Sequence, residues 1–159
     1  ILDEIRRIAI STVAATKYRI AKQLHPLQIN LPEDMRSISL RILANMDFQL
    51  EFDGEEHLST LSPSFLDDLF LFYKECLANI IKHSRASKVT TYIRGDKKNI
   101  ELLVTDNGQG MKSSTKDPVP PSLNRRTHLF GGKLDVTYPS SGGMTITLIY
   151  KRRRFKIRK

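Results

Sequence analysis

The feature that most restricts the fold is a long helix pattern followed at once by a β-hairpin pattern. Between Ser62 and Ile80, apolar residues recur at the spacing of one side of a helix: Leu66, Leu69, Phe72, Tyr73, Cys76, Leu77 and Ile80. Apolar and polar residues then alternate over 89–93 and 100–104, on either side of the turn Gly95-Asp96-Lys97-Lys98. This order predicts a helix that packs on one face of a sheet containing the hairpin.

The rest of the chain supplies further elements of the same kinds. Residues 1–24 predict an amphipathic helix that ends before Pro26, and Pro32 begins a second helix pattern that runs to about Asn45. Later patterns predict strands over 48–52, 134–138 and 146–150, a loop over 111–121 and a helix over 122–130. We therefore expect an α+β fold: a two-layer α/β sandwich, with a mixed sheet of about five strands, helices on one face and an additional N-terminal helix.

Composition fits one globular domain and excludes several classes of protein. The chain has 159 residues, of which 40% are hydrophobic and 27% charged. It contains no apolar run of membrane-spanning length. The one cysteine, Cys76, excludes an intramolecular disulfide and favours a reducing, cytoplasmic location. The first residues resemble neither a signal peptide nor an initiator start, so we expect a fragment of a longer protein.

The formal net charge of +9 comes mostly from the C-terminal end. Residues 151–159 hold seven of the 26 basic side chains and no acidic one, so the rest of the chain is nearly neutral. Such a tail could contact nucleic acid or anionic lipid. We favour the simpler interpretation, in which it is a solvated strand end or a linker.

Four polar residues share one side of the long helix pattern. Glu75, Asn79, Lys82 and His83 are spaced i, i+4, i+7 and i+8, and we expect their side to lie opposite the apolar stripe. A carboxylate can orient water or accept a proton, an amide oxygen can bind Mg²⁺, and Lys82 and His83 can meet phosphate oxygens. The alternative is an ordinary solvated helix side.

A second polar cluster follows the hairpin. Asp106-Asn107-Gly108-Gln109-Gly110 lies where the second strand pattern ends. The carboxylate of Asp106 can accept a hydrogen bond from an exocyclic amine such as adenine N6, and Gly108 and Gly110 allow a ligand to approach the backbone closely. The alternative is a simple turn, for which Asp-Asn-Gly is common. Together, the two clusters predict a nucleotide site.

These motifs resemble those of two-component sensor histidine kinases. The run from Tyr73 to Ser87 resembles their asparagine box, in the subgroup of nitrate sensors and the bacterial membrane-fluidity thermosensor. Asp106–Gly110 resembles their first glycine box, and Ser141-Gly142-Gly143 their terminal glycine turn. Leu24-His25-Pro26-Leu27 and the segment after it resemble the link between dimerisation helix and catalytic domain.

The resemblance implies an ATP-binding domain of the gyrase, Hsp90, histidine kinase and MutL superfamily. It implies a dimerisation-helix remnant over 1–30, a catalytic domain over 31–150 and a basic tail over 151–159. Glu75 would be catalytic, Asn79 would bind Mg²⁺, Asp106 would read adenine, and the lid would run from Met111 to Pro121. The other ATP-binding positions would be Lys82, His83, Gly108, Gly110, Met111, Gly142 and Gly143.

The implied reaction passes the γ-phosphoryl group of ATP to a histidine and then to an aspartate of a response regulator. The parent protein would be a cytoplasmic or membrane-anchored homodimer that meets the membrane only through parts absent from this sequence. No specific nucleic-acid partner is implied.

The sequence departs from the family in three places. His25, His57, His83 and His128 all lie outside a first dimerisation helix, so we expect no phosphoacceptor histidine and no normal autophosphorylation. Val119-Pro120-Pro121-Ser122-Leu123 replaces the usual glycine-leucine pair after the lid. Met144 replaces the usual threonine, and we expect Thr145 to face the opposite side of its strand.

Two other functional classes compete with an active kinase domain. A degenerate kinase-like domain could serve as a signalling scaffold or regulator-binding module, as the missing glycine pair indicates. A nucleic-acid-binding domain could use the basic tail. Binding of ATP with Mg²⁺ would distinguish an active kinase domain from both of these alternatives.

Overall fold

The computed structural model describes Leu2, Ile5 and residues 29–110 and 119–152. The chain divides into two compact units, Ile1–Asn30 and Leu31–Lys159. In the first unit, Leu2 and Ile5 are helical and exposed. The rest of the helix expected over 1–24, most of the expected lid and tail residues 153–159 lie outside the described residues. The expected division into residues 1–30, 31–150 and 151–159 stays a prediction.

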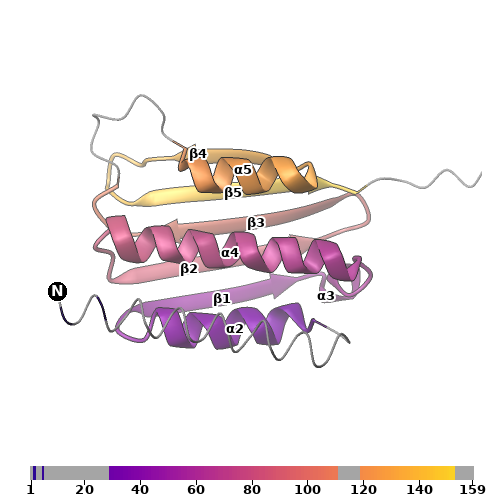
Figure 1. Ribbon diagram of the computed structural model, residues 1–159, viewed down its shortest axis with the longest axis horizontal. Coiled ribbons are helices and arrows are strands. Elements are labelled where there is room, and N and C mark those ends of the chain that lie inside the picture. Colours follow the sequence, from indigo (N-terminus) through magenta and orange to yellow (C-terminus); the bar gives the residue numbers. More distant parts are fainter. Residues whose placement is uncertain (1, 3–4, 6–28, 111–118, 153–159) are drawn as a thin grey trace, which may run out of the picture. The chain divides into compact units, whose positions relative to one another are not determined.

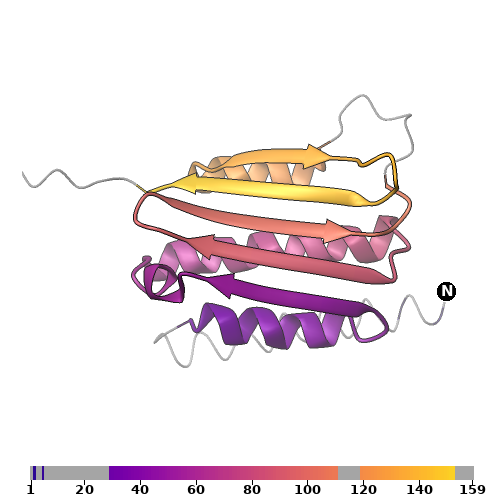
Figure 2. The same cartoon turned by 180° about the vertical axis from the view of Figure 1, so that it is seen from behind.

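The second unit contains a mixed sheet of five strands, as the sequence predicted (Figures 1 and 2). The strands are β1 (Asp47–Asp53), β2 (Lys88–Gly95), β3 (Asn99–Asp106), β4 (Lys133–Thr137) and β5 (Met144–Lys151). Their spatial order is β1-β2-β3-β5-β4. β1 and β2 are parallel, whereas the three other neighbouring pairs are antiparallel.

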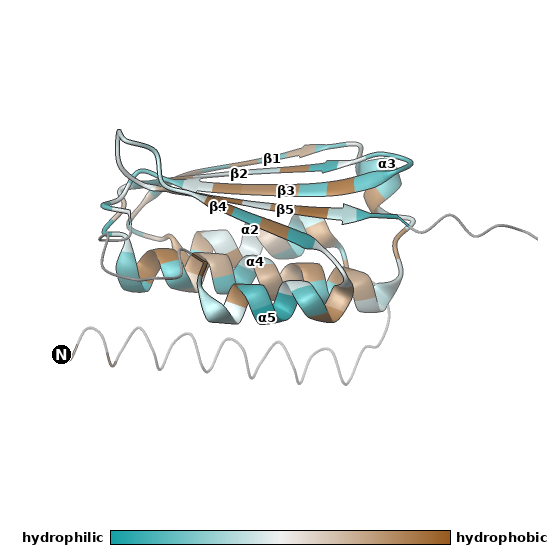
Figure 3. Cartoon of the chain, turned by 90° about the horizontal axis from the view of Figure 1, so that it is seen from above, coloured by the Kyte–Doolittle hydropathy of each residue, from teal (hydrophilic) through white to brown (hydrophobic). Residues whose placement is uncertain are grey.

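Three longer helices lie together on one side of this sheet (Figure 3). They are α2 (Leu31–Ile42), α4 (Pro63–His83) and α5 (Pro121–Phe130). α2 and α5 both pack against α4, which is the central helix of the layer. None of the described helices combines the length and the apolar character that a membrane span requires.

Local sequence explains where the central helix begins and why a short helix precedes it. The Ser62 hydroxyl accepts a hydrogen bond from the Phe65 backbone N–H at 3.3 Å, and Pro63 occupies the first turn. The one-turn helix α3 (Glu55–Leu58) was not predicted. It starts at Gly54, whose φ of 72° is readily available only to glycine. No apolar repeat marks so short an element.

The core lies between α4 and the inner face of the sheet. Alternate residues of the central strands point inward and are buried, among them Ile93, Leu102 and Ile146. They face an apolar stripe of α4 that includes the fully buried Cys76. Burial raises the pKa of the Cys76 thiol well above its ordinary value, so this residue is a core side chain and not a nucleophile.

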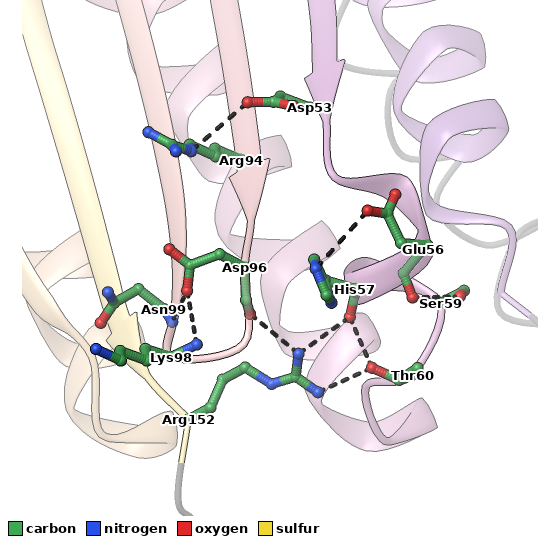
Figure 4. A network of polar contacts seen from close by, with 10 residues as sticks. All are labelled: Asp53, Glu56, His57, Ser59, Thr60, Arg94, Asp96, Lys98, Asn99 and Arg152. Carbon is green, nitrogen blue, oxygen red and sulfur yellow. Dashed lines mark hydrogen bonds and ion pairs between the residues drawn. The ribbon is translucent and has the colours of Figure 1, made fainter.

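A polar network centred on Arg152 closes the end of the sheet where β5 finishes (Figure 4). Its guanidinium donates to the carbonyl oxygen of Asp96 at 3.1 Å and to the Thr60 hydroxyl at 2.8 Å. The Asp96 carboxylate accepts from the backbone N–H groups of Lys98 and Asn99, which fixes the β2–β3 turn. The network therefore ties the end of β5 to that turn and to the segment before α4.

A buried hydroxyl cluster joins α2, α4 and β2. The Tyr73 hydroxyl lies 2.7 Å from the Ser39 hydroxyl and accepts a hydrogen bond from Thr91 at 3.3 Å, while Ser39 donates to the Met35 carbonyl. All three hydroxyl-bearing residues are buried. Burial also raises the pKa of the Tyr73 phenol.

Replacing Tyr73 with Phe tests this cluster. The change leaves Ser39 and Thr91 without their shared partner, and we expect it to lower the free energy of unfolding by about 1–3 kcal/mol. Urea unfolding followed by circular dichroism measures the effect. Tyr92→Phe is the matched control, because the hydroxyl of Tyr92 bonds to an exposed Asp53 carboxylate. Equal losses in the two variants would contradict a special role for the buried hydroxyl.

Candidate functional site

The polar residues of α4 lie on a flank of the helix. Glu75 and Asn79 are half-buried, whereas Lys82 and His83 are exposed. This half-burial differs from the expectation of a side directly opposite the apolar stripe. The reason is that α4 is packed by the sheet and by a helix on each side, so its apolar stripe is broad.

This flank faces α5. The rings of Phe72 in α4 and Phe130 in α5 pack edge to face, with centroids 6.2 Å apart. Asn79 follows Phe72 by about two helical turns and so points to the same side of α4. The structure therefore places the half-buried amide on the α5 side of the central helix.

The side chain of Asn79 is oriented by its own helix. Its Nδ2 donates to the carbonyl oxygen of Glu75 at 2.9 Å. A carbonyl oxygen can only accept, so this bond fixes which amide atom points back along the helix. Oδ1, on the other side of the planar amide, points away from that carbonyl. This is the geometry expected of an oxygen that could bind a cation.

The carboxyl group of Asp106 lies at the end of β3 and is 3% exposed. Its Oδ1 accepts a hydrogen bond from the Gly108 backbone N–H at 2.8 Å. Its Oδ2 is buried and has no hydrogen-bond partner among the described residues. A buried, unpaired acceptor is costly, so this oxygen suits a ligand that brings a donor.

Burial also changes the titration of this carboxyl. Desolvation raises the pKa of Asp106, and the hydrogen bond from Gly108, together with weaker contacts from the Ser84 side chain and the Met144 backbone, opposes that change. Neither weaker contact has the geometry of a hydrogen bond to Oδ2. A carboxyl with a raised pKa, a buried position and a free acceptor oxygen has the properties of a ligand-binding group.

The two polar clusters meet through Ser84, the residue that caps the C-terminal end of α4. Its carbonyl oxygen accepts from the backbone N–H of Gln109 at 2.7 Å. A Cβ on Gly108 would lie only 2.1 Å from the same carbonyl oxygen. Only glycine therefore permits the turn after Asp106 to pack against the end of α4.

A second glycine turn, which immediately precedes β5, packs against the first one. Gly142 and Gly143 have φ values of 98° and 86°, and a Cβ on Gly143 would lie 2.0 Å from the carbonyl oxygen of Asp106. Gly110 has a φ of 67°, and a Cβ there would lie 2.9 Å from the carbonyl oxygen of Gly143. The structure thus brings together all four predicted glycines, whereas Met111 lies outside the described residues.

Asn107, a residue with no predicted role, holds this turn to the start of β2. Its Oδ1 accepts from the backbone N–H groups of Ser87 and Lys88 at 2.9 and 2.8 Å, and its Nδ2 donates to the Ser87 hydroxyl. An asparagine beside a glycine turn commonly bonds to backbone, but the sequence does not show to which segment.

The strand register explains the departure at Met144. Met144 pairs with Asp106 and is buried on the inner face of the sheet. Thr145 pairs with Thr105, and their hydroxyl oxygens are 3.2 Å apart. Because neighbouring residues of a strand point to opposite faces, Thr145 does not replace a threonine at position 144, as expected.

The start of α5 offers few backbone donors to an anion. Pro121 has no N–H, and the N–H groups of Leu123 and Asn124 both donate to the carbonyl oxygen of Pro120. The prolines that stand in place of the glycine-leucine pair therefore reduce the number of free backbone N–H groups at the start of α5.

The described residues offer single donor groups to a cation or a ligand. Within them, no group of three or more His, Cys, Asp or Glu side chains could hold a metal. Mg²⁺ commonly takes only one or two protein ligands when a phosphate supplies others. Asn79 Oδ1 suits such a bridging ion, and Asp106 Oδ2 suits an amino donor on a base.

Comparison with known proteins gives relatives of one kind. No family profile matches the chain. It is 31% identical over 100 residues to sensor histidine kinase LiaS of Bacillus subtilis, and 29% identical over 86 residues to sensor histidine kinase YxjM of the same organism. These alignments cover 61% and 54% of the chain. The chain spans only 27% and 21% of the lengths of these relatives.

Solved structures show the same fold. The catalytic domain of histidine kinase ThkA superimposes with a TM-score of 0.58 at 17% identity, over 77% of this chain and 92% of that domain. The ATP-binding domain of PrrB from Mycobacterium tuberculosis gives 0.59 at 19% identity, over 79% and 93%. The fold is that of histidine kinase catalytic domains, and the sequence matches support homology to sensor histidine kinases. Neither sequence relative is named as a nitrate sensor or thermosensor, so that subgroup stays a prediction.

Replacing Gly108 with Ala tests the contact between the two clusters. The new methyl group would meet the Ser84 backbone, which cannot move aside as a side chain would, and we expect a loss of about 3 kcal/mol in unfolding free energy. Gly131→Ala is the control, because its φ is 73° but nothing lies within 4 Å of the new Cβ. We expect that variant to lose about 1 kcal/mol. The reverse ranking in urea unfolding would contradict the close contact.

Replacing Asp106 with Asn tests the raised pKa of the buried carboxyl. The folded chain holds this proton more tightly than the unfolded chain, so the ionised group costs stability. As pH rises from the ordinary carboxyl pKa through the raised value, we expect wild type to lose stability relative to Asp106→Asn. Above that interval the difference should stay constant. Thermal unfolding of both proteins across pH measures it, and a difference that changes in the opposite direction would exclude the proposed burial effect.

Proposed function

We propose that this chain is the ATP-binding catalytic region of a sensor histidine kinase and binds ATP with Mg²⁺. The observation that supports it most is the buried, unpaired Oδ2 of Asp106 in a turn held against the end of the polar helix. Adenine N6 supplies the donor that this oxygen lacks. Homology to sensor histidine kinases gives independent support.

In this proposal, the polar residues of the two clusters bind different parts of the nucleotide. Asp106 accepts a hydrogen bond from the base, and the glycine turns allow the base to approach the backbone. Asn79 Oδ1 would be the protein ligand of Mg²⁺, Lys82 and His83 would meet phosphate oxygens, and Glu75 would orient the reacting group. A bound Mg²⁺ would neutralise charge on the transferring phosphoryl group.

The phosphoryl acceptor would lie on a part of the parent protein outside this sequence. Of the histidines the structure describes, His57 lies in α3, His83 in α4 and His128 in α5, and none is on a dimerisation helix. We propose that the γ-phosphoryl passes to a histidine of the parent dimer and then to an aspartate of a response-regulator receiver domain. The proposed location is cytoplasmic.

One observation supports a second candidate function. The start of α5 has few free N–H groups, because Pro121 lacks one and two others bond to Pro120. Weak phosphate binding would leave a degenerate domain that holds a response regulator without phosphorylating it. Such a domain would keep the fold and lose the dependence on nucleotide.

Calorimetric titration of ATP and ADP into this chain with Mg²⁺ tests the main proposal. We expect wild type to bind both nucleotides. Asp106→Ala should weaken both by about tenfold or more, because the base loses its acceptor. Asn79→Ala should weaken ATP only when Mg²⁺ is present, because the lost contact is to the metal.

Folding controls decide how a negative result is understood. Asp135→Ala changes an exposed carboxylate on β4 and should leave nucleotide affinity unchanged. Circular dichroism must show each variant folded. A folded wild-type chain that binds neither nucleotide at saturating Mg²⁺ would overturn the proposal and favour the degenerate scaffold.

A further inference from the structure

Tyr138 lies immediately after β4 and has no part in the functions assigned above. Thr137 pairs with Thr145, so continuing the antiparallel register places Tyr138 opposite Met144. Met144 in turn pairs with Asp106. Aspartate, methionine and tyrosine therefore form one row across β3, β5 and the end of β4.

The three side chains of this row belong to the helix-covered face of the sheet. Asp106 and Met144 are buried there, and the half-buried Tyr138 follows the inward alternation of Leu134 and Val136. The row therefore offers a carboxylate, a thioether and an aromatic ring on one side of the sheet. A flat, partly polar ligand needs contacts of this kind.

Gly110 brings the aromatic ring to the turn that holds the carboxylate. A Cβ on Gly110 would lie 3.5 Å from Cδ1 of Tyr138, which is ordinary contact distance. The ring therefore lies beside the second glycine of the turn. Burial and, secondarily, the nearby Asp106 carboxylate raise the pKa of the Tyr138 phenol, which agrees with this placement.

We propose that the ring of Tyr138 is the aromatic platform on which the nucleobase stacks, while Asp106 reads the edge of the base. This proposal rests on the proposed nucleotide function and adds a binding residue to it. Stacking is tolerant of base identity, because every base has an aromatic face, whereas the carboxylate distinguishes an amino group from a carbonyl. The two residues should therefore have separable effects.

Titrations of Mg-ATP and Mg-ITP separate these effects, since the inosine base carries a carbonyl oxygen in place of the amino group. We expect Tyr138→Leu to weaken both nucleotides by the same factor, about tenfold. Tyr138→Phe keeps the ring and should bind both within about twofold of wild type. Asp106→Asn should instead change the ratio of the two affinities.

A spectroscopic measurement detects the same contact between ring and base independently of the binding affinity. The chain has five tyrosines and no tryptophan, so its near-ultraviolet absorbance comes mainly from tyrosine. Adding Mg-ADP to wild type should perturb the tyrosine band, and this perturbation should be lost in Tyr138→Leu. Tyr92→Leu is the matched control: Tyr92 lies on the opposite face of the sheet, so the change should leave both the affinity and the nucleotide-induced perturbation in place.

Each outcome has a definite meaning. If wild type binds nucleotide but Tyr138→Leu, shown folded by circular dichroism, binds equally well, the platform is excluded and the nucleotide function stands. Equal weakening in Tyr138→Phe and Tyr138→Leu would also overturn it, because the hydroxyl and not the ring would then matter. If wild type binds neither nucleotide, the proposed function and this inference both fail.

Discussion

The packing of the Asp106–Gly110 turn against the end of α4 is the contact on which the candidate site depends. Gly108 has no room for a Cβ beside the Ser84 carbonyl, and Gln109 donates to that same oxygen. The contact sets the distance between a polar helix and a strand end that are separate in sequence. Without it, the end of α4 and the turn after Asp106 would not be held together.

The rest of the fold holds this contact in place from both sides. Behind the turn, Gly143 approaches the Asp106 backbone so closely that a side chain is excluded, and Gly142 lies against the Gly108 carbonyl oxygen. Beside it, Asn107 accepts two backbone hydrogen bonds from the start of β2. At the other end of the sheet, Arg152 ties the end of β5 to the segment before α4. Most of these contacts involve backbone groups, so they determine the path of the chain around the site.

Sequence periodicity predicted the sheet, the main helices and the grouping of polar residues on α4. It could do so because apolar spacing follows directly from which residues are buried. It could not predict α3, because this four-residue helix is too short to show an apolar repeat and begins at Gly54, a glycine with a left-handed backbone conformation. Nor could it find the partners of Asn107 or the row that contains Tyr138, because both depend on strand register between distant segments. The half-burial of Glu75 depended similarly on packing by two neighbouring helices.

The parallel pairing of β1 with β2 has a consequence for how the chain loses order. Asp47 pairs with Lys88 across a connection that contains both α3 and α4, so closing this pair carries a large loop-entropy cost. β1 is also an edge strand, whereas Asp106 and Met144 belong to central strands. Strand β1 can therefore unfold locally, as a separate foldon, while the glycine turns keep their arrangement.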